Sequence, residues 1–177
     1  IPSLFNLNEI LVVSDGMEAR AGTITSGKEW FMLWRTVDGK EIKSDIRSKS
    51  MEVLLKGMFQ KDRFLDIARH FLVFEEEQNA TQKKLAGYHQ YYAVNKAVEA
   101  TIKASSTKGD RRCGVVWHSQ GAGKSLTMVF YTGKLVLALD NPTIVLLTDR
   151  NDLDDQLFET FGRCQEILRQ KPVHAET

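Results

Sequence analysis

The chain has 177 residues, of which 42% are hydrophobic and 27% charged, an ordinary composition for a globular protein that excludes a disordered chain. Its 24 basic and 23 acidic side chains give a formal net charge of +1, so any contact with nucleic acid must be local. No apolar run approaches the roughly 20 residues of a membrane span, which predicts a protein without a membrane partner.

The first 76 residues have the pattern of an α+β segment. EILVVSDG is an apolar run that ends in an Asp-Gly turn, and ARAGTITSGKEWFMLW alternates around a Ser-Gly turn, so both predict short antiparallel hairpins. Residues 48–74 change to helical spacing in two amphipathic segments. The polar run EEEQN that follows predicts a break, and we place a domain boundary between residues 76 and 77.

The second part of the chain alternates between predicted helices and strands. A helix is expected from about residue 82 to 104, and a polar connector follows it to residue 110. Alternating strands and helices indicate a parallel sheet with helical crossovers, and hence an α/β fold. The predicted order is strand 114–117, a glycine loop, helix 124 to about 139, strand 143–148 and helix from about 152 to 168.

The glycine loop HSQGAGKS matches the phosphate-binding pattern GxxxxGK[ST] except at its first position, where His118 replaces glycine. Its two glycines let consecutive amides point at phosphate oxygens, and the positive end of the following helix adds to the same place. We therefore expect ATP and Mg²⁺ as ligands, against the alternative of a chance glycine turn. The residues expected to bind the nucleotide are Ser119, Gln120, Gly121, Ala122, Gly123, Lys124 and Ser125, with Lys124 also catalytic and Ser125 also the magnesium ligand.

The acidic half of an ATPase site is not evident after the loop. Asp149 ends a predicted strand, but Arg150 follows it and TDRNDLDDQ is not a DExx sequence. Residues 111–177 also supply two strands where a sheet normally has five or six. Because the chain begins with isoleucine and stops without an obvious closing element, we expect it to be part of a larger protein and to be inactive in hydrolysis by itself.

Three blocks, KLAGYHQYYAVNKAVEA, GVVWHSQGAGKSLTM and TIVLLTDRNDLDDQLFETF, resemble successive helicase motifs of the R (restriction and translocation) subunits of type I restriction enzymes. The opening of the chain resembles the segment that follows the nuclease core of those subunits. The resemblance covers nearly the whole chain. It implies the end of a PD-(D/E)xK-type nuclease domain in residues 1–76, a connector helix with an adenine-recognition motif in 77–110, and an incomplete RecA-like P-loop parallel sheet in 111–177.

The resemblance also implies a function for the complete protein. It would be an ATP-dependent DNA translocase and endonuclease that cleaves unmodified foreign DNA, with double-stranded DNA and the methylation and specificity subunits as partners. Gln90 would recognise the adenine edge, and Thr148, Asp149 and Arg150 would lie near the phosphate backbone of DNA. The nuclease residues are expected before residue 1 and the DExx motif after residue 177.

Each of these site assignments has a plainer alternative. The segment around Gln90 has the composition of an aromatic-rich core helix. Asp149 or Asn151 could cap the next helix while Arg150 is solvated. The resemblance implies a superfamily 2 DNA translocase, and the alternatives for the whole site are a different superfamily 2 helicase, a P-loop ATPase or kinase, or a non-catalytic domain with a vestigial loop.

Glu41-Ile42-Lys43 fits the ExK half of a nuclease site, with Asp15 or Asp38 as a further carboxylate for Mg²⁺. Its polar flanks indicate an exposed face instead of a buried catalytic strand, and we favour that interpretation. Two cysteines without metal-ligand spacing suit a reducing compartment, and no signal-peptide pattern begins the chain. We therefore expect a cytoplasmic protein.

Overall fold

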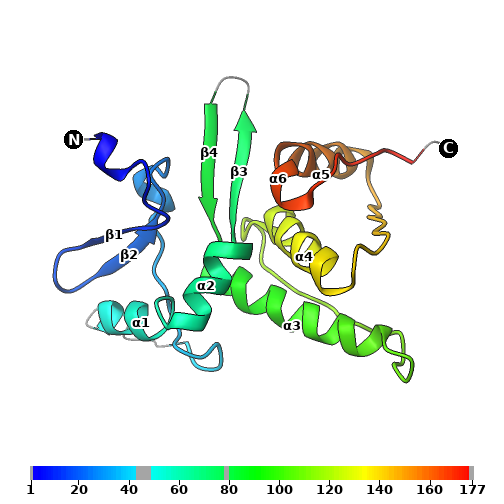
Figure 1. The fold of residues 1–177 in the computed structure, drawn as a ribbon, viewed down its shortest axis with the longest axis horizontal. Helices are drawn as coiled ribbons and strands as arrows, with labels where there is room; N and C mark the ends of the chain where they lie inside the picture. Colours follow the sequence, from blue (N-terminus) through cyan, green and yellow to red (C-terminus); the bar gives the residue numbers. More distant parts are fainter. Residues whose placement is uncertain (1, 43–48, 78–79, 176–177) are drawn as a thin grey trace. The chain divides into compact units, whose positions relative to one another are not determined.

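A computed structural model describes residues 2–42, 49–77 and 80–175 of the chain. The chain forms two compact units, residues 1–92 and 93–177, and each has its own core (Figure 1). The boundary predicted after residue 76 lies inside a β-strand of the first unit. One helix, α3 (Tyr88–Ser105), begins in the first unit and ends in the second.

The first unit opens with a short 3-10 helix, η1 (Pro2–Phe5), and an antiparallel hairpin of β1 (Leu11–Ser14) and β2 (Ala19–Gly22). The Asp15 carboxylate accepts the amides of the two residues that close the turn, at 2.9 and 2.7 Å. These bonds hold the pKa of Asp15 below its ordinary value. The predicted Asp-Gly hairpin is thereby confirmed.

The second predicted hairpin is only partly formed. Ala21 and Met32 exchange two backbone hydrogen bonds, of 3.0 and 2.9 Å, as an isolated antiparallel bridge. Between them the chain makes a 3-10 turn, η2 (Lys28–Trp30), where the alternation had predicted the start of a returning strand. Turn geometry therefore overrides the strand pattern in this stretch.

Two helices follow in the predicted helical zone, α1 (Ser50–Lys56) and α2 (Lys61–His70). Apolar side chains of these helices and of the residues just after them build the core of the first unit, where Leu54, Met58, Ile67 and Phe71 are at most 2% exposed. The two predicted amphipathic helices are confirmed, but the prediction was wrong for residues 72–74 at the end of the zone, which belong to a β-strand. Residue 48, where the zone was predicted to begin, lies outside the described residues.

An antiparallel hairpin replaces the break and the helix start predicted for residues 75–87. Its strands are β3 (Leu72–Glu77) and β4 (Ala80–Leu85). Leu72 pairs with Leu85 on a buried face, and Lys84 forms an ion pair with Glu75 across the strands. The helix predicted for residues 82–104 is confirmed from Tyr88 onward. Its predicted start at residue 82 was wrong, because cross-strand partners, and not the local spacing, decide the structure of residues 82–85.

The first turns of α3 carry an aromatic cluster. The rings of Tyr88, Tyr91 and Tyr92 lie 5.8–6.4 Å from the buried ring of Trp34, as measured between ring centroids. Phe71 adds a further contact with Tyr91, at 4.8 Å. Burial, and after it the nearby carboxylate of Asp66, raises the pKa of the Tyr91 phenol. This segment has the packing of an aromatic core helix.

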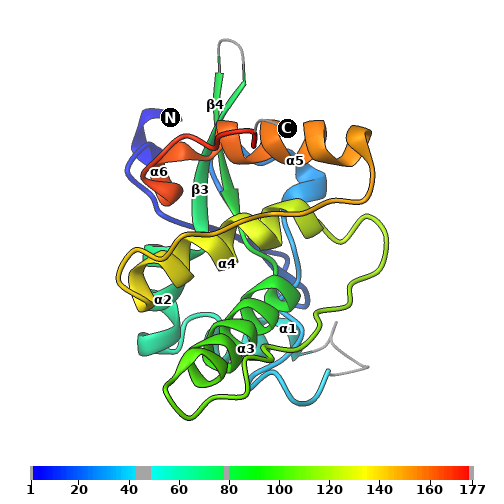
Figure 2. The same ribbon diagram turned by 90° about the vertical axis from the view of Figure 1, so that its right-hand side faces the viewer.

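The second unit contains the remainder of α3, α4 (Lys124–Ala138), α5 (Asn151–Arg163) and α6 (Gln165–Leu168). Figures 1 and 2 show α4 side by side with α5 and α6. Val129 and Phe130 of α4 are fully buried. The helices predicted from residues 124 and 152 are confirmed, with a one-residue interruption at Cys164 between α5 and α6.

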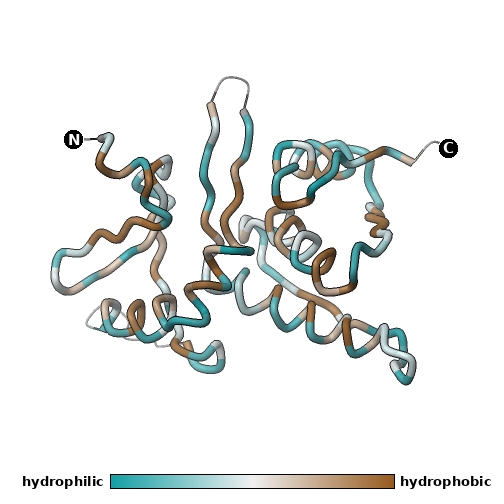
Figure 3. The backbone as a smooth tube through the Cα atoms, viewed as in Figure 1, coloured by the Kyte–Doolittle hydropathy of each residue, from teal (hydrophilic) through white to brown (hydrophobic). Residues whose placement is uncertain are grey.

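The predicted parallel sheet is not present in the described residues. Their only sheets are the two antiparallel pairs β1–β2 and β3–β4. Residues 114–117 and 143–148 join no strand, and Val115, Trp117 and Leu147 are 84–93% exposed. Figure 3 marks the apolar character of the second segment, which lies between α4 and α5. A central strand needs hydrogen-bonding neighbours on both sides, and the described chain provides none for these segments.

No helix in the part of the chain that the structure describes combines the length and the apolar character required to cross a lipid bilayer.

Candidate nucleotide-binding site

The glycine loop directly precedes α4, and its backbone adopts the conformations expected of it. Gly121 has φ +79° and Gly123 has φ +72° with ψ 41°, both in the region that favours glycine. A Cβ on Gly121 would meet nothing within 4 Å, so the backbone angle and not a lack of space requires glycine there. The Ala122 amide donates to the Ser119 carbonyl at 3.3 Å, which closes the turn.

The N-terminus of α4 has the properties of an anion site. Gly123 is its N-cap and supplies no side-chain acceptor. Thr127 donates twice to the Gly123 carbonyl, from its amide at 2.9 Å and from its hydroxyl at 3.0 Å, and thereby fixes the first turn. Amides of a first helical turn have no acceptor inside the helix, and the helix dipole places positive charge at the same end.

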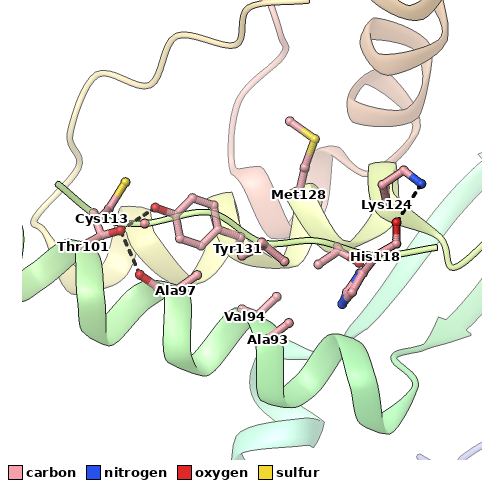
Figure 4. Close-up of a pocket in the computed structure, with 12 residues that line it drawn as sticks. Ala93, Val94, Ala97, Thr101, Cys113, His118, Lys124, Met128 and Tyr131 are labelled. Carbon is pink, nitrogen blue, oxygen red and sulfur yellow. Dashed lines mark hydrogen bonds between the residues drawn. The ribbon is translucent and has the colours of Figure 1, made fainter. Parts of the chain in front are cut away.

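Lys124 reaches back over the loop. Its ammonium group donates to the Ser119 carbonyl at 3.0 Å and to the His118 carbonyl at 3.4 Å, and the side chain is exposed. Figure 4 shows the contact with His118. A cation is therefore held beside the helix end, where it adds to the positive potential that a phosphate would meet.

Ser125, the predicted magnesium ligand, is half-buried in the first turn of α4, and its hydroxyl has no hydrogen-bond partner within the described residues. Those residues contain no group of three or more histidine, cysteine or acidic side chains that could hold a metal ion. A site with one hydroxyl ligand suits Mg²⁺, which usually keeps several waters and binds phosphate oxygens. The single hydroxyl ligand of Ser125 thus suits a Mg²⁺ ion that is bound together with a nucleotide triphosphate.

Behind the loop lies a cavity of about 240 Å³. Its walls come from α3, α4 and residues 113–118, and they are mostly apolar (Figure 4). His118 and Lys124 line one end. At the other end the hydroxyl groups of Thr101 and Tyr131 form a hydrogen bond of 2.7 Å. The departure from the glycine pattern at position 118 therefore places an imidazole in the cavity wall.

Sequence reasoning did not find this cavity. Its lining residues lie on three separate segments between Ala93 and Tyr131, and no motif connects them. A second polar bridge between the same two helices, from the Lys134 ammonium to the Asn95 amide oxygen at 2.6 Å, was missed for the same reason. The only local signal was the row of small and polar side chains on α3.

Gln90 is buried, with 5% of its surface exposed, and its amide oxygen accepts the Gly87 amide at 2.9 Å. This is the bond that a glutamine at the third helical position makes to the N-cap residue. Gln90 therefore caps α3 within the aromatic cluster. It belongs to the first unit, whereas the glycine loop belongs to the second.

Thr148, Asp149 and Arg150 are all exposed before α5. Arg150 forms an ion pair with Asp152, with contacts of 2.5 and 3.1 Å. The alternative that Asp149 or Asn151 caps α5 is wrong, because the N-cap is Arg150 and no side chain caps the helix. The guanidinium of Arg150 is thus occupied locally, although it remains accessible to solvent.

The ExK pattern shows no sign of a nuclease site in the residues that are described. Glu41 and Ile42 are exposed, and Lys43 lies outside the described residues. Asp15 is engaged in its hairpin turn, and the Asp38 carboxylate accepts the Lys40 amide at 3.0 Å, which lowers the Asp38 pKa. Both carboxylates therefore act as turn acceptors.

Comparison with known proteins agrees with the loop geometry. Residues 89–177 match the family model described as SWI2/SNF2 ATPase. The matched range contains Gln90, the glycine loop, α4 and α5. It begins near the N-terminus of α3 and extends through the second unit.

The similarity to single proteins extends further along the chain. The endonuclease subunit of the HindI type I restriction enzyme of Haemophilus influenzae is 47% identical over 180 residues, covering 99% of this chain. The endonuclease subunit of a type I restriction enzyme of Staphylococcus aureus strain COL is 24% identical over 163 residues, covering 90%. The aligned part spans 17% and 16% of the length of these two relatives.

Proposed function

The chain belongs to the SWI2/SNF2 ATPase family, and from this premise we propose that it is the ATP-binding portion of the R subunit of a type I restriction enzyme. The similarity to endonuclease subunits along almost the whole chain supports the assignment. Because the chain spans about a sixth of those relatives, the activity of the complete protein is part of the proposal and not of the finding.

The complete subunit, in this proposal, translocates double-stranded DNA at the expense of ATP and cleaves unmodified foreign DNA. It works in the cytoplasm together with methylation and specificity subunits. Residues 1–76 would be the end of the nuclease domain, 77–110 the connector, and 111–177 the start of a RecA-like motor domain. Segments 114–117 and 143–148 would pair there with strands from other parts of the subunit, which would bury their exposed apolar side chains.

The observation that carries the ATP-binding proposal is the combination of two left-handed glycines, a helix N-terminus whose N-cap glycine has no side-chain acceptor, and Lys124. The loop amides and the first turn of α4 bind the phosphate oxygens, and Lys124 moves its hydrogen bonds from the loop carbonyls to the β- and γ-phosphates. Ser125 would hold Mg²⁺, and the ion when bound would supply neutralisation of charge on the phosphates. Gln90 recognises the adenine edge. For this role its side-chain amide must contact the base while it also keeps its hydrogen bond to the Gly87 amide.

The phosphate backbone of DNA is proposed to contact Thr148, Asp149 and Arg150. For Arg150, this contact would exchange its ion pair with Asp152 for a phosphate. An exposed ion pair of this kind contributes little to stability, about 0–1 kcal/mol, so the exchange is energetically accessible. Contacts to phosphates carry no base information, which suits a motor that moves over any sequence.

The test is the binding of a fluorescent ATP analogue to this chain and to Lys124→Ala. We expect at least tenfold weaker binding by Lys124→Ala, because a hydrogen bond to a charged group contributes about 1.5–3 kcal/mol. Lys171→Ala removes another exposed lysine, one that lies outside the loop, and should bind as the parent does. Equal affinity of all three proteins would exclude the phosphate-binding role of the loop.

The motor role is tested in the complete subunit by ATP hydrolysis with and without duplex DNA. Hydrolysis that DNA stimulates is expected. Nucleotide binding without any stimulation by DNA would contradict the translocase assignment and favour another kind of P-loop enzyme.

A further inference from the structure

A cluster of four basic side chains lies in the last turn of α3 and in the loop that follows it. We call it the basic cap, and it consists of Lys103, Lys108, Arg111 and Arg112. All four are exposed. Asp110 is the single acidic residue between positions 100 and 113, so this stretch has a formal charge of 4 − 1 = +3, whereas the whole chain has +1. The local field required for contact with a polyanion is therefore present here.

The main chain holds the basic cap in shape. The Arg111 amide returns to the Ala104 carbonyl at 3.2 Å, and the Gly109 amide donates to the Ser106 carbonyl at 2.9 Å. Gly109 fits so closely that a Cβ would lie 2.1 Å from the Ala104 oxygen. Arg111 itself has φ 64°, an uncommon conformation for a residue other than glycine. The loop is thus a defined turn folded back on the helix end.

The charges of the basic cap are not neutralised. Within the described residues none of its four side chains forms an ion pair, in contrast to Arg150. The Asp110 carboxylate accepts the Arg112 backbone amide at 3.0 Å and so serves the turn. Attraction to the negative end of α3 accounts for Lys103, which lies in the last helical turn, but the other three residues lie beyond the helix.

We propose that the basic cap binds the sugar-phosphate backbone of duplex DNA without reading bases, in addition to the contact proposed for residues 148–150. The inference rests on the proposed function in so far as that function supplies DNA as the partner. Lysine and arginine are the residues that contact phosphates. Because the turn is already ordered, binding would cost little loop entropy.

An acidic protein surface is the competing partner, and the composition of the cap disfavours it. Protein interfaces have an apolar, often aromatic centre. Among residues 100–112 the only large apolar side chain that is exposed is Ile102, at 42%. A polar, cation-rich surface of this kind is typical of contacts to nucleic acid.

The test is DNA binding by the complete R subunit in which Lys103→Gln, Lys108→Gln and Arg112→Gln are combined. Arg111 is kept because its amide and its backbone angle shape the turn. Binding of a random-sequence duplex is followed by fluorescence anisotropy at several salt concentrations. The slope of log K against log salt concentration should become shallower by about 2.7, since each phosphate contact contributes about 0.9.

The matched control is the combination of Lys28→Gln, Lys61→Gln and Lys171→Gln, which removes the same charge from three exposed positions elsewhere. Its slope should equal that of the parent. A charge-preserving variant with Lys103→Arg, Lys108→Arg and Arg112→Lys should also keep the slope, which excludes misfolding as the cause. An equal loss of slope in the first variant and in the control overturns the proposal.

An unchanged slope in the first variant likewise overturns the proposal. If that variant instead associated more weakly with the partner subunits, the basic cap would be assigned to a protein interface. The result for DNA binding by the basic cap does not depend on the nucleotide-binding loop. Fluorescent-nucleotide binding should be the same in all these variants, so a failure of the basic cap leaves the loop assignment intact. A failure of Lys124→Ala to weaken nucleotide binding would count against the proposed function alone.

Discussion

At Gly121 the effect of the backbone angle on a substitution can be separated from the effect of the surrounding space. A Cβ there meets nothing within 4 Å, and φ is +79°. We therefore predict that Gly121→Ala lowers the free energy of unfolding by about 1 kcal/mol through backbone strain alone. The same strain should disturb the loop amides and weaken the binding of a fluorescent ATP analogue. Urea denaturation and nucleotide titration measure the two effects.

Gly162 is the matched control for that substitution. Its Cβ would also meet nothing within 4 Å, but the residue lies in α5 with no positive φ. Gly162→Ala should therefore stabilise the chain, by up to about 1 kcal/mol, because alanine favours the helix more than glycine does. If both substitutions changed stability in the same direction, the argument from backbone angle would be refuted.

At the scale of elements, α3 and α4 are joined across the cavity by the hydroxyl groups of Thr101 and Tyr131, at 2.7 Å. We predict a coupling free energy of about 1 kcal/mol between Thr101→Val and Tyr131→Phe in a double-mutant cycle. Thr101 also donates to the Ala97 carbonyl of its own helix, and the cycle cancels the loss of that bond. Additive effects on urea denaturation would show that the bridge does not stabilise the pair.

The elements differ in how far they could be predicted from the sequence. Helix α4 has helical apolar spacing and begins directly after the glycine loop, so its position follows from local pattern. The hairpin β3–β4 does not, because its stability depends on pairs such as Leu72 with Leu85, thirteen residues apart. The glycine loop was predictable because its chemistry is contained in eight consecutive residues. The cavity was not, because Thr101 and Tyr131 meet only in the folded chain.

At the scale of the whole molecule, apolar segments are left in contact with water. Val145 is 73% and Leu147 90% exposed. We predict that this chain alone binds a hydrophobic dye and self-associates, and that Val145→Lys with Leu147→Lys reduces both. Dye fluorescence and light scattering are the measurements. Gln156→Lys with Gln170→Lys adds the same charge at exposed polar positions and should change dye binding little.

In the complete protein the same double substitution should be harmful instead of beneficial. If residues 143–148 become a central strand there, two lysines would be buried in the sheet, and the double substitution should prevent folding of the motor domain. Tolerance of both lysines in the complete protein would contradict the sheet proposed for this segment. The sequence showed the apolar run, but the presence of a sheet depends on strands that the described residues do not contain.

The turn that follows α3 also bears on the evolution of this surface. Its form depends on peptide groups, through the Arg111 amide and the close fit of Gly109, and not on what its basic side chains touch. The turn therefore does not require a basic side chain at positions 108 and 112, and at position 103 the only structural reason for one is the weak attraction to the end of α3. Orthologues that nevertheless keep positive charge at these three positions, while neighbouring exposed positions diverge, would bear the signature of selection by a ligand.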